Sequence, residues 1–379
     1  MADAICYQRC LILGQLGRCL DELGQPEQAA NYYQQELTEL KLLEPSQQIN
    51  QEMSIVQTDL ADALTNMGNY SEARKVYKTI LSLDQKLKNT RNQAVVQHQQ
   101  GNLEMFQGNM QEAEKHYHEA RKILQLLNEH NSEATVLHQL GMLYQKNRQW
   151  EKAEEVYRQS VQIKEMQGDW AGAAKTWNHL AQVNSLVGKF KEAECWFRKA
   201  IEAGKVAKNW LSVSGALKSL AALLKHQSQQ RLEEALKLAK KALHLEKKLE
   251  PGATEIWKTY NILADIADKQ GNAQEAKKNR RLARESKANF AGTRYELKQK
   301  YSQLILAVAR GENVEAALEG YGEDWENLKT AIQQILAGER DVEKLCEPLT
   351  YYEAPIITAI LEGIERPESL KWFEQDCTD

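Results

Sequence analysis

The chain has 379 residues, of which 42% are apolar and 27% charged, and its formal net charge is −4. With 6 prolines and 20 glycines, the composition favours helices joined by short turns. The small net charge argues against nucleic acid as a partner, and the lack of an apolar run of about 18 residues argues against a membrane span.

The N-terminal residues and the cysteines predict a cytoplasmic protein without a metal or cofactor. No basic segment followed by an apolar one begins the chain, so no signal peptide is expected. The six cysteines lack Cys-x-x-Cys spacing, which predicts reduced thiols. Cys6 and Cys10 lie four residues apart, but no histidine or second cysteine pair completes a tetrahedral metal site.

From the N-terminus to about residue 287, one pattern of small and aromatic residues recurs. A small residue is followed by a turn glycine about seven positions later, an alanine five further on, and an aromatic residue four beyond that. The five clear copies are Gly17/Gly24/Ala29/Tyr33, Ala61/Gly68/Ala73/Tyr77, Gly101/Gly108/Ala113/Tyr117, Gly141/Arg148/Ala153/Tyr157 and Ala181/Gly188/Ala193/Phe197. Two degenerate copies contain Ala221/Ala235 and Ala264/Gly271/Ala276/Arg280. A period of about 40 residues with these features predicts helix–turn–helix repeats.

Each position of the pattern has a physical requirement. Two helices approach closely only where a side chain is small, so Gly or Ala is expected where the two helices of a repeat touch. The turn glycine can adopt the positive φ that ends the first helix. The aromatic residue lies on the same helical face as the alanine and fills the space beside the small residue.

The segment Leu140-Gly141-x-x-Tyr144 followed by Trp150-Glu151-x-Ala153-x-x-x-Tyr157 resembles the tetratricopeptide repeat signature. The period of about 40 is similar to that of the longer repeats of kinesin light chains and bacterial signalling proteins. This resemblance implies an all-α, right-handed superhelical solenoid of about seven repeats over residues 1–287. A small helical cap is expected over residues 288–379.

The resemblance also implies where a partner would bind. Its contacts lie on the concave surface, at positions three before and one, four or five after the small residue of each first helix. The predicted partner-binding residues are Arg18, Asp62, His98, Asn102, His138, Met142, Gln145, Asn178, Gln182, Lys218, Lys225, Asn261 and Asp265. The amide side chains among them can bond the main chain of a peptide. His98 and His138 occupy equivalent positions and could form one surface.

The residues that follow the repeats have a different composition. Apolar residues recur at helical spacing in segments 293–309, 324–337 and 351–363, and glycines at 311, 320, 322, 338 and 363 punctuate them. Residues 231–310 contain 18 Lys and Arg against 10 Asp and Glu, whereas residues 312–379 contain 5 against 17. We therefore expect this region to dock on the last repeats, with Leu304, Ile305, Trp325 and Ile332 supplying most of the apolar contact. The alternative is a free acidic module that recruits a basic partner.

No phosphate-binding loop, dinucleotide-binding turn, His-Glu-x-x-His pair or nucleophile elbow occurs in the chain. The expectation is therefore a non-enzymatic scaffold or adaptor that binds a protein, peptide or helix. The alternative is a ligand-sensing regulatory arm of a larger bacterial signalling ATPase or effector system. A stand-alone hydrolase is a third and weaker interpretation.

Overall fold

The computed structural model describes residues 2–249, 254–312, 314, 318 and 325–374. In this part of the chain every regular element is a helix. No helix among these residues has both the length and the apolar composition that crossing a membrane requires. The predicted all-α fold of paired repeat helices is therefore confirmed.

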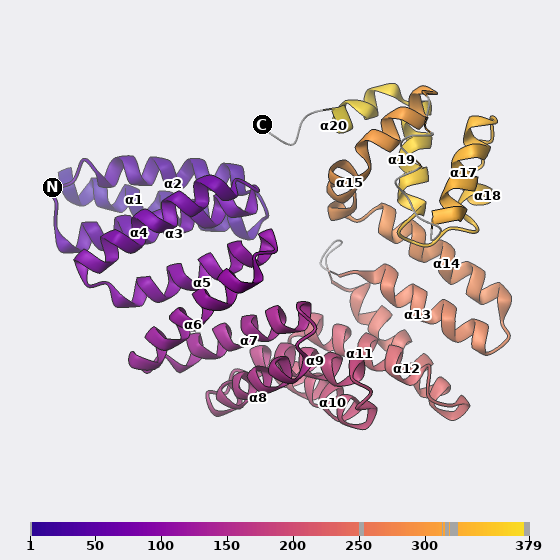
Figure 1. Ribbon diagram of the computed structural model, residues 1–379, viewed down its shortest axis with the longest axis horizontal. Coiled ribbons are helices and arrows are strands. Elements are labelled where there is room, and N and C mark those ends of the chain that lie inside the picture. The colour runs from indigo at the N-terminus through magenta and orange to yellow at the C-terminus, as the bar shows by residue number, and fades with distance from the viewer. Residues whose placement is uncertain (1, 250–253, 313, 315–317, 319–324, 375–379) are drawn as a thin grey trace. The chain divides into compact units, whose positions relative to one another are not determined.

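Clustering of contacts divides the chain into two compact units, residues 1–193 and 194–379, with the division inside α10 (Phe190–Val206). Figure 1 shows the helices of the first unit following one another as antiparallel pairs. They are α1 (Ala2–Glu22), α2 (Pro26–Leu40), α3 (Gln47–Asn66), α4 (Tyr70–Leu87), α5 (Thr90–Gln107), α6 (Met110–Leu126), α7 (His130–Lys146), α8 (Trp150–Met166) and α9 (Trp170–Leu186). The first helices of neighbouring pairs also touch, α1 with α3, α3 with α5, α5 with α7 and α7 with α9. We call the surface formed by these helices the first-helix face.

The second unit continues with two further pairs and then a group of helices of unequal length. The pairs are α11 (Trp210–Leu224) with α12 (Gln229–Glu246) and α13 (Ile256–Lys269) with α14 (Ala273–Ala288). The group contains α15 (Ala291–Arg310), α17 (Glu326–Leu336), α18 (Val342–Cys346), α19 (Ala354–Glu365), the 3-10 helix η2 (Pro367–Leu370) and α20 (Lys371–Glu374). Helices are thus present in all three predicted segments, while Gly320 and Gly322 lie outside the described residues. The predicted boundary at residue 287 stays a prediction.

The turns between paired helices use the left-handed backbone conformation that the pattern predicts. Gly68, Gly108 and Gly188 have φ of 85°, 83° and 80°. Arg148, which replaces the glycine in the fourth repeat, adopts the same conformation with φ of 57°. Since a side chain disfavours this conformation, the turn geometry that the fourth repeat shares with its neighbours imposes it at Arg148.

Side-chain caps start several of the helices. Asp169 accepts a hydrogen bond from the Gly172 amide at 2.8 Å, and Asn209 accepts one from the Ser212 amide at 3.0 Å. Such bonds satisfy amide groups that have no partner within the helix. Gly168 thus ends the preceding turn in the left-handed conformation, and Asp169 caps the first turn of α9, which begins at Trp170.

The small residues lie where the paired helices touch. A Cβ atom placed on Gly101 would lie 2.5 Å from the nearest ring carbon of Tyr117, and one on Gly141 would lie 2.3 Å from that of Tyr157. Because these distances are far below van der Waals contact, each glycine makes room for the tyrosine of its own repeat. The predicted packing of small against aromatic residues is confirmed.

The C-terminal helices have a hydrophobic core of their own. Leu304, Ile305 and Ile332 are buried in it together with Ile356 and Ile360 of α19. The cluster of Leu304, Ile305 and Ile332 runs from Leu297 to Phe373 and Trp325 packs against it, so the prediction that these four residues hold the region to the repeats stays a prediction. An amphipathic stripe predicts that a residue is buried, but it does not identify the buried partner.

Candidate functional site

The tyrosine of the second helix reaches a polar side chain of the first helix in four successive repeats. The hydroxyl of Tyr33 donates a hydrogen bond to Asp21 at 3.0 Å, and that of Tyr77 donates one to Asp62. The hydroxyl of Tyr117 donates one to Asn102 at 2.7 Å, and that of Tyr157 donates one to Gln145 at 3.1 Å. In the seventh repeat Arg280 replaces the tyrosine and pairs with Asp268. These bonds join the two helices of a repeat, and they engage three of the side chains predicted to bind a partner.

Asn102 and Asp62 have further partners within the chain. Gln99 donates a hydrogen bond to Asp62 at 2.6 Å, and Asn102 donates one to the side-chain oxygen of Gln99 at 2.6 Å. Burial raises the pKa of Asp62 to about 7, against the opposing effect of the bonds from Tyr77 and Gln99. A partner's main chain would have to compete with these bonds, so Asp62 and Asn102 are poorly placed to hold an extended peptide.

The two predicted histidines each lie against the tyrosine of their own repeat. The ring centroids of His98 and Tyr117 are 5.9 Å apart, and those of His138 and Tyr157 are 5.5 Å apart. His138 also lies 5.1 Å from the ring of His179 in the following repeat. Burial lowers the pKa of His98 to about 4, so this imidazole is neutral near pH 7.

A buried cluster around His138 connects α7, α8 and α9. Lys164, which is 6% exposed, donates a hydrogen bond to the hydroxyl of Thr176 at 3.0 Å, and Nδ1 of His138 lies 3.0 Å from the same hydroxyl. Burial lowers the pKa of Lys164 to about 8 and that of His179 to about 4. Since positive charge is disfavoured here, we interpret the cluster as a polar connection between repeats.

Four of the five predicted charged residues are held in ion pairs. Arg18 contacts Asp59 at 3.0 Å, and Lys218 contacts the buried Glu246 at 3.1 Å. Lys225 and Asp265, both predicted to bind a partner, pair with each other between α11 and α13. Four predicted polar or flexible side chains are half-buried on first helices, namely Met142, Asn178, Gln182 and Asn261. The carboxamide oxygen of Asn178 is buried without a hydrogen-bond partner among the described residues.

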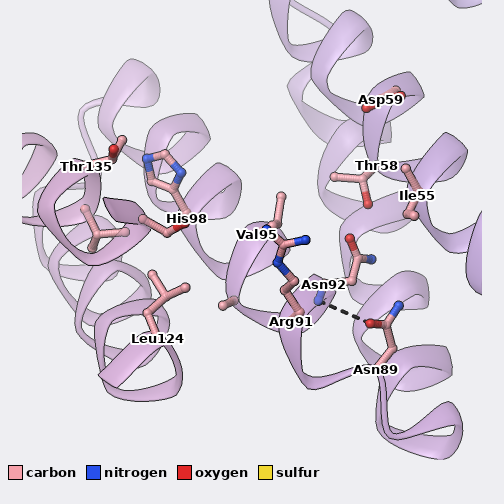
Figure 2. Close-up of a pocket in the computed structure, with 13 residues that line it drawn as sticks. Ile55, Thr58, Asp59, Asn89, Arg91, Asn92, Val95, His98, Leu124 and Thr135 are labelled. Carbon is pink, nitrogen blue, oxygen red and sulfur yellow. Dashed lines mark hydrogen bonds between the residues drawn. The ribbon is translucent and has the colours of Figure 1, made fainter. Parts of the chain in front are cut away.

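The first-helix face also contains a pocket of about 430 Å³. Figure 2 shows Val95 and Arg91 of α5 between Ile55 and Asp59 of α3 and Thr135 of α7. Its other lining residues are Thr58, Asn89, Asn92, Ala94, His98, Leu124, Ser132 and Val136. His98 is the one predicted partner-binding residue among them. The pocket is therefore centred nearer the N-terminal ends of the first helices than the predicted positions.

The aliphatic side chains at this pocket belong to a row that continues beyond it. Leu11, Ile55 and Val95 stand six residues before the small residue of their repeats and are 41%, 38% and 42% exposed. Thr135 has the same position in the fourth repeat and is also exposed. Extending the predicted stripe by one helical turn toward the N-terminus would have identified this row, since residues three and four apart share a face.

The charges that border the pocket are paired. Arg91 contacts Glu129 at 3.2 Å, and the Arg18–Asp59 pair borders the pocket on its α3 side. Within the part of the chain that the structure describes, no group of three or more His, Cys, Asp or Glu side chains could hold a metal ion. The pocket combines an apolar centre with neutralised charges, an arrangement suited to recognising an apolar side chain of a partner.

Comparison with known proteins identifies the repeats. Models of the tetratricopeptide repeat match residues 12–47 and, in three overlapping copies, residues 52–125, 92–166 and 132–205. Together these matches cover half of the chain. No curated protein matches the sequence.

Several solved structures share the fold. One is a signal transduction ATPase with numerous domains from Pyrococcus horikoshii, which has a tetratricopeptide repeat sensor. The two sequences are 17% identical and the TM-score is 0.60, and the match covers 73% of this chain and 41% of the ATPase. The others are the apo quorum sensor NprR from B. thuringiensis (17% identity, TM-score 0.56, 74% of this chain and 77% of that one) and aspartyl phosphate phosphatase F from Bacillus subtilis (9%, 0.56, 77% and 73%). This chain thus spans about two fifths of the ATPase.

Proposed function

Because the chain belongs to the tetratricopeptide repeat family, in its longer class of about 40 residues per repeat, we propose that it is a non-enzymatic scaffold or adaptor of the cytoplasm. It captures a peptide or helix of a partner protein on the first-helix face of residues 1–193. The observation that carries the proposal is the row of exposed aliphatic side chains at Leu11, Ile55 and Val95, which adjoins the pocket. An exposed apolar row rimmed by polar residues is typical of an interaction surface.

The proposed site includes only some of the thirteen residues predicted from the sequence and adds residues that were not predicted. We place the apolar anchor of the partner at Ile55 and Val95, because these side chains are exposed and make no polar contact. The half-buried Asn178 and Gln182 are proposed to bond the partner further along the face, since the unsatisfied oxygen of Asn178 needs a donor. Asp62, Asn102 and Gln145 are proposed to shape the surface indirectly through the tyrosines.

The test replaces Ile55 and Val95 together by glutamate in the full chain and measures capture of partners from the native host by mass spectrometry. Both side chains are exposed, so helicity should be kept while the specific partners are lost. The control is Leu126→Glu, because Leu126 is 75% exposed at the end of α6 and does not line the pocket. Equal capture by the wild type and the double variant would refute binding at this row.

The alternative function is a sensor arm of a larger signalling ATPase or effector system. The feature that favours it is the similarity to the Pyrococcus horikoshii protein, of which this chain covers 41%. A sensor arm would recover chiefly one effector in the same capture experiment and would change its activity, whereas a scaffold would recover several separate partners.

We further propose that the C-terminal region caps the last repeats. The contacts that support it lie between α14 and the helices α15 and α19, together with the ion pairs Lys277–Glu347 at 2.6 Å and Arg281–Glu343 at 3.3 Å. Lys287 also lies 5.9 Å from the ring of Tyr352. Each exposed ion pair contributes only about 0 to 1 kcal/mol, so the charges mainly orient the cap.

A further inference from the structure

A cleft of about 450 Å³ separates α14 from α18, and basic side chains of α14 line it. Lys277, Lys278, Arg281 and Arg284 form one wall, and Glu343 and Glu347 lie on the opposite wall. These residues lie outside the face to which the proposed function is attributed. We call this space the α14–α18 cleft.

The carboxylates of the chain itself show which chemistry fits the basic wall. Glu347 pairs with Lys277 and Glu343 with Arg281, but all four side chains are more than half exposed. Ion pairs of this exposure are weak and are easily replaced by other carboxylates. The acidic wall therefore satisfies part of the basic wall without closing the cleft.

Arg284 is the cation of this wall that lacks such a partner. It forms no ion pair with any carboxylate in the described part of the chain, although Lys277, Lys278 and Arg281 each form at least one. Its guanidinium is half-buried, and this burial lowers its pKa. An unpaired charge that has lost part of its hydration is stabilised when a carboxylate binds to it.

Arg284 also lines a second cavity, of about 210 Å³, which shares Arg281 and Glu343 with the cleft. Ala288, Val342 and Ala354 contribute apolar surface to this cavity. The exposed fraction of Val342 is 45%, which leaves an aliphatic side chain in contact with water. Arg284 thus lines both a charged cleft and a smaller cavity with apolar surface.

We propose that the α14–α18 cleft is a second binding site, for an acidic segment of a partner protein that carries an aliphatic side chain next to a carboxylate. The carboxylate bonds the guanidinium of Arg284, and the aliphatic side chain enters the smaller cavity beside Val342. Lys277 and Lys278 attract the remaining acidic residues of the segment. The binding energy comes from pairing the half-buried Arg284 and from covering Val342.

The test selects displayed heptapeptides on the full chain and then measures the affinity of the synthesised winners. We expect a class of peptides with Asp or Glu next to Leu, Ile or Val. Arg284→Gln should weaken this class by about tenfold or more, because the variant removes the charge-assisted hydrogen bonds to the carboxylate of the peptide. Arg284→Lys, which keeps the charge but not the two-pronged geometry, should lose less.

Two controls separate this site from the one on the first-helix face. Lys241→Gln removes one positive charge from the exposed surface of α12 and should leave the acidic–aliphatic peptides bound. The double variant Ile55→Glu and Val95→Glu should also retain them. The inference is overturned if no such class is selected, or if Arg284→Gln and Lys241→Gln bind the class equally. Peptides lost only in the Ile55 and Val95 variant would support the proposed function and count against the cleft.

Discussion

At the scale of single residues, Glu36 is the most unusual side chain of the first unit. It is 1% exposed, and its carboxylate lies beneath Gly14, where a Cβ atom would be 2.6 Å from one oxygen. One of its oxygens is buried without a hydrogen-bond partner among the described residues. Burial raises the pKa of Glu36 to about 7, against the opposing charge of Arg18. The residue is thus a buried acid that loses its proton only near neutral pH.

This raised pKa predicts a pH-dependent stability. The folded state holds the Glu36 proton more tightly than the unfolded state, so the contribution of Glu36 to the free energy of unfolding should fall as pH rises from about 4.5 to about 7 and stay low above it. Glu36→Gln keeps the shape without the charge and should be more stable than the wild type at about pH 8, by up to about 3 kcal/mol. Urea unfolding at about pH 5 and pH 8 measures both effects.

The exposed Glu27 of the same helix supplies the matched control for this measurement. Glu27→Gln should retain the wild-type pH dependence, apart from small surface effects. If Glu27→Gln and Glu36→Gln behave alike at both pH values, the buried carboxylate does not set the pH dependence. Asp62, whose pKa burial also raises to about 7, should contribute a dependence of the same sign in Glu36→Gln, whereas the buried His98 and His179, whose pKa values burial lowers to about 4, contribute the opposite sign.

Arg148 is a second residue in an unfavourable setting, because its φ of 57° is one that side chains disfavour. Arg148→Gly should raise the free energy of unfolding by about 0.5 to 1 kcal/mol, since the left-handed conformation costs about 1 to 2 kcal/mol and the freedom of glycine in the unfolded chain offsets part of it. Gly108→Arg, with φ of 83° in the equivalent turn, should lose a similar amount. Urea midpoints that move in the same direction for both variants would contradict this explanation.

At the scale of the helix pair, the contact between small residue and aromatic ring is the critical one. Gly141→Ala would bring a methyl group to 2.3 Å from a carbon of the Tyr157 ring. Overpacking of this kind should cost about 1 to 3 kcal/mol of stability, measured by thermal unfolding. Gly215→Ala is the control, because nothing lies within 4 Å of the added carbon in α11. It should be neutral or stabilising, since alanine favours a helix over glycine; equal destabilisation by the two changes would exclude the contact as the cause.

Neighbouring pairs are joined by buried polar contacts that the repeat pattern does not contain. Asp84 of α4 is buried and accepts hydrogen bonds from Ser54 at 2.6 Å and from Asn92 at 2.7 Å. Lys164 occupies the equivalent position of α8 and bonds Thr176. In the other repeats of the first unit Leu40 and Leu124 stand there. Because each contact joins a different pair of residue types, they favour the native order of repeats over a shifted one.

At the scale of the whole molecule, the proposed cap predicts the effect of shortening the chain. A chain ending at Lys287 should melt at a lower temperature and bind an apolar dye, because it loses the cover over α14 and the bond from Thr293 to the Lys287 carbonyl, which is 2.7 Å long. Thermal melting, dye binding and size-exclusion chromatography of the two chains test this. Unchanged melting of a monomeric short chain would instead favour residues 312–379 as an acidic module that recruits a basic partner.

The sequence by itself determined the helices, their pairing and the turns. Those features depend on residues at fixed spacing, such as Gly101 with Tyr117 or Gly108 at a turn, and each works through contacts within one repeat. Because the same contacts within a repeat recur along the chain, the five clear copies of the pattern were enough to predict the fold.

Only the tertiary structure decided which polar residues of the first-helix face are available. The sequence places Asp62, Asn102 and Gln145 on that face, but it does not show that tyrosine hydroxyls bond all three. Nor does it show that Lys225 and Asp265 pair with each other. The two cavities that Arg284 lines are formed with residues about 60 positions away along the chain, which spacing within α14 does not reveal. Spacing along one helix shows which residues share a face. Whether those residues are free to bind a partner depends on side chains from other helices, which only the folded chain brings into contact with them.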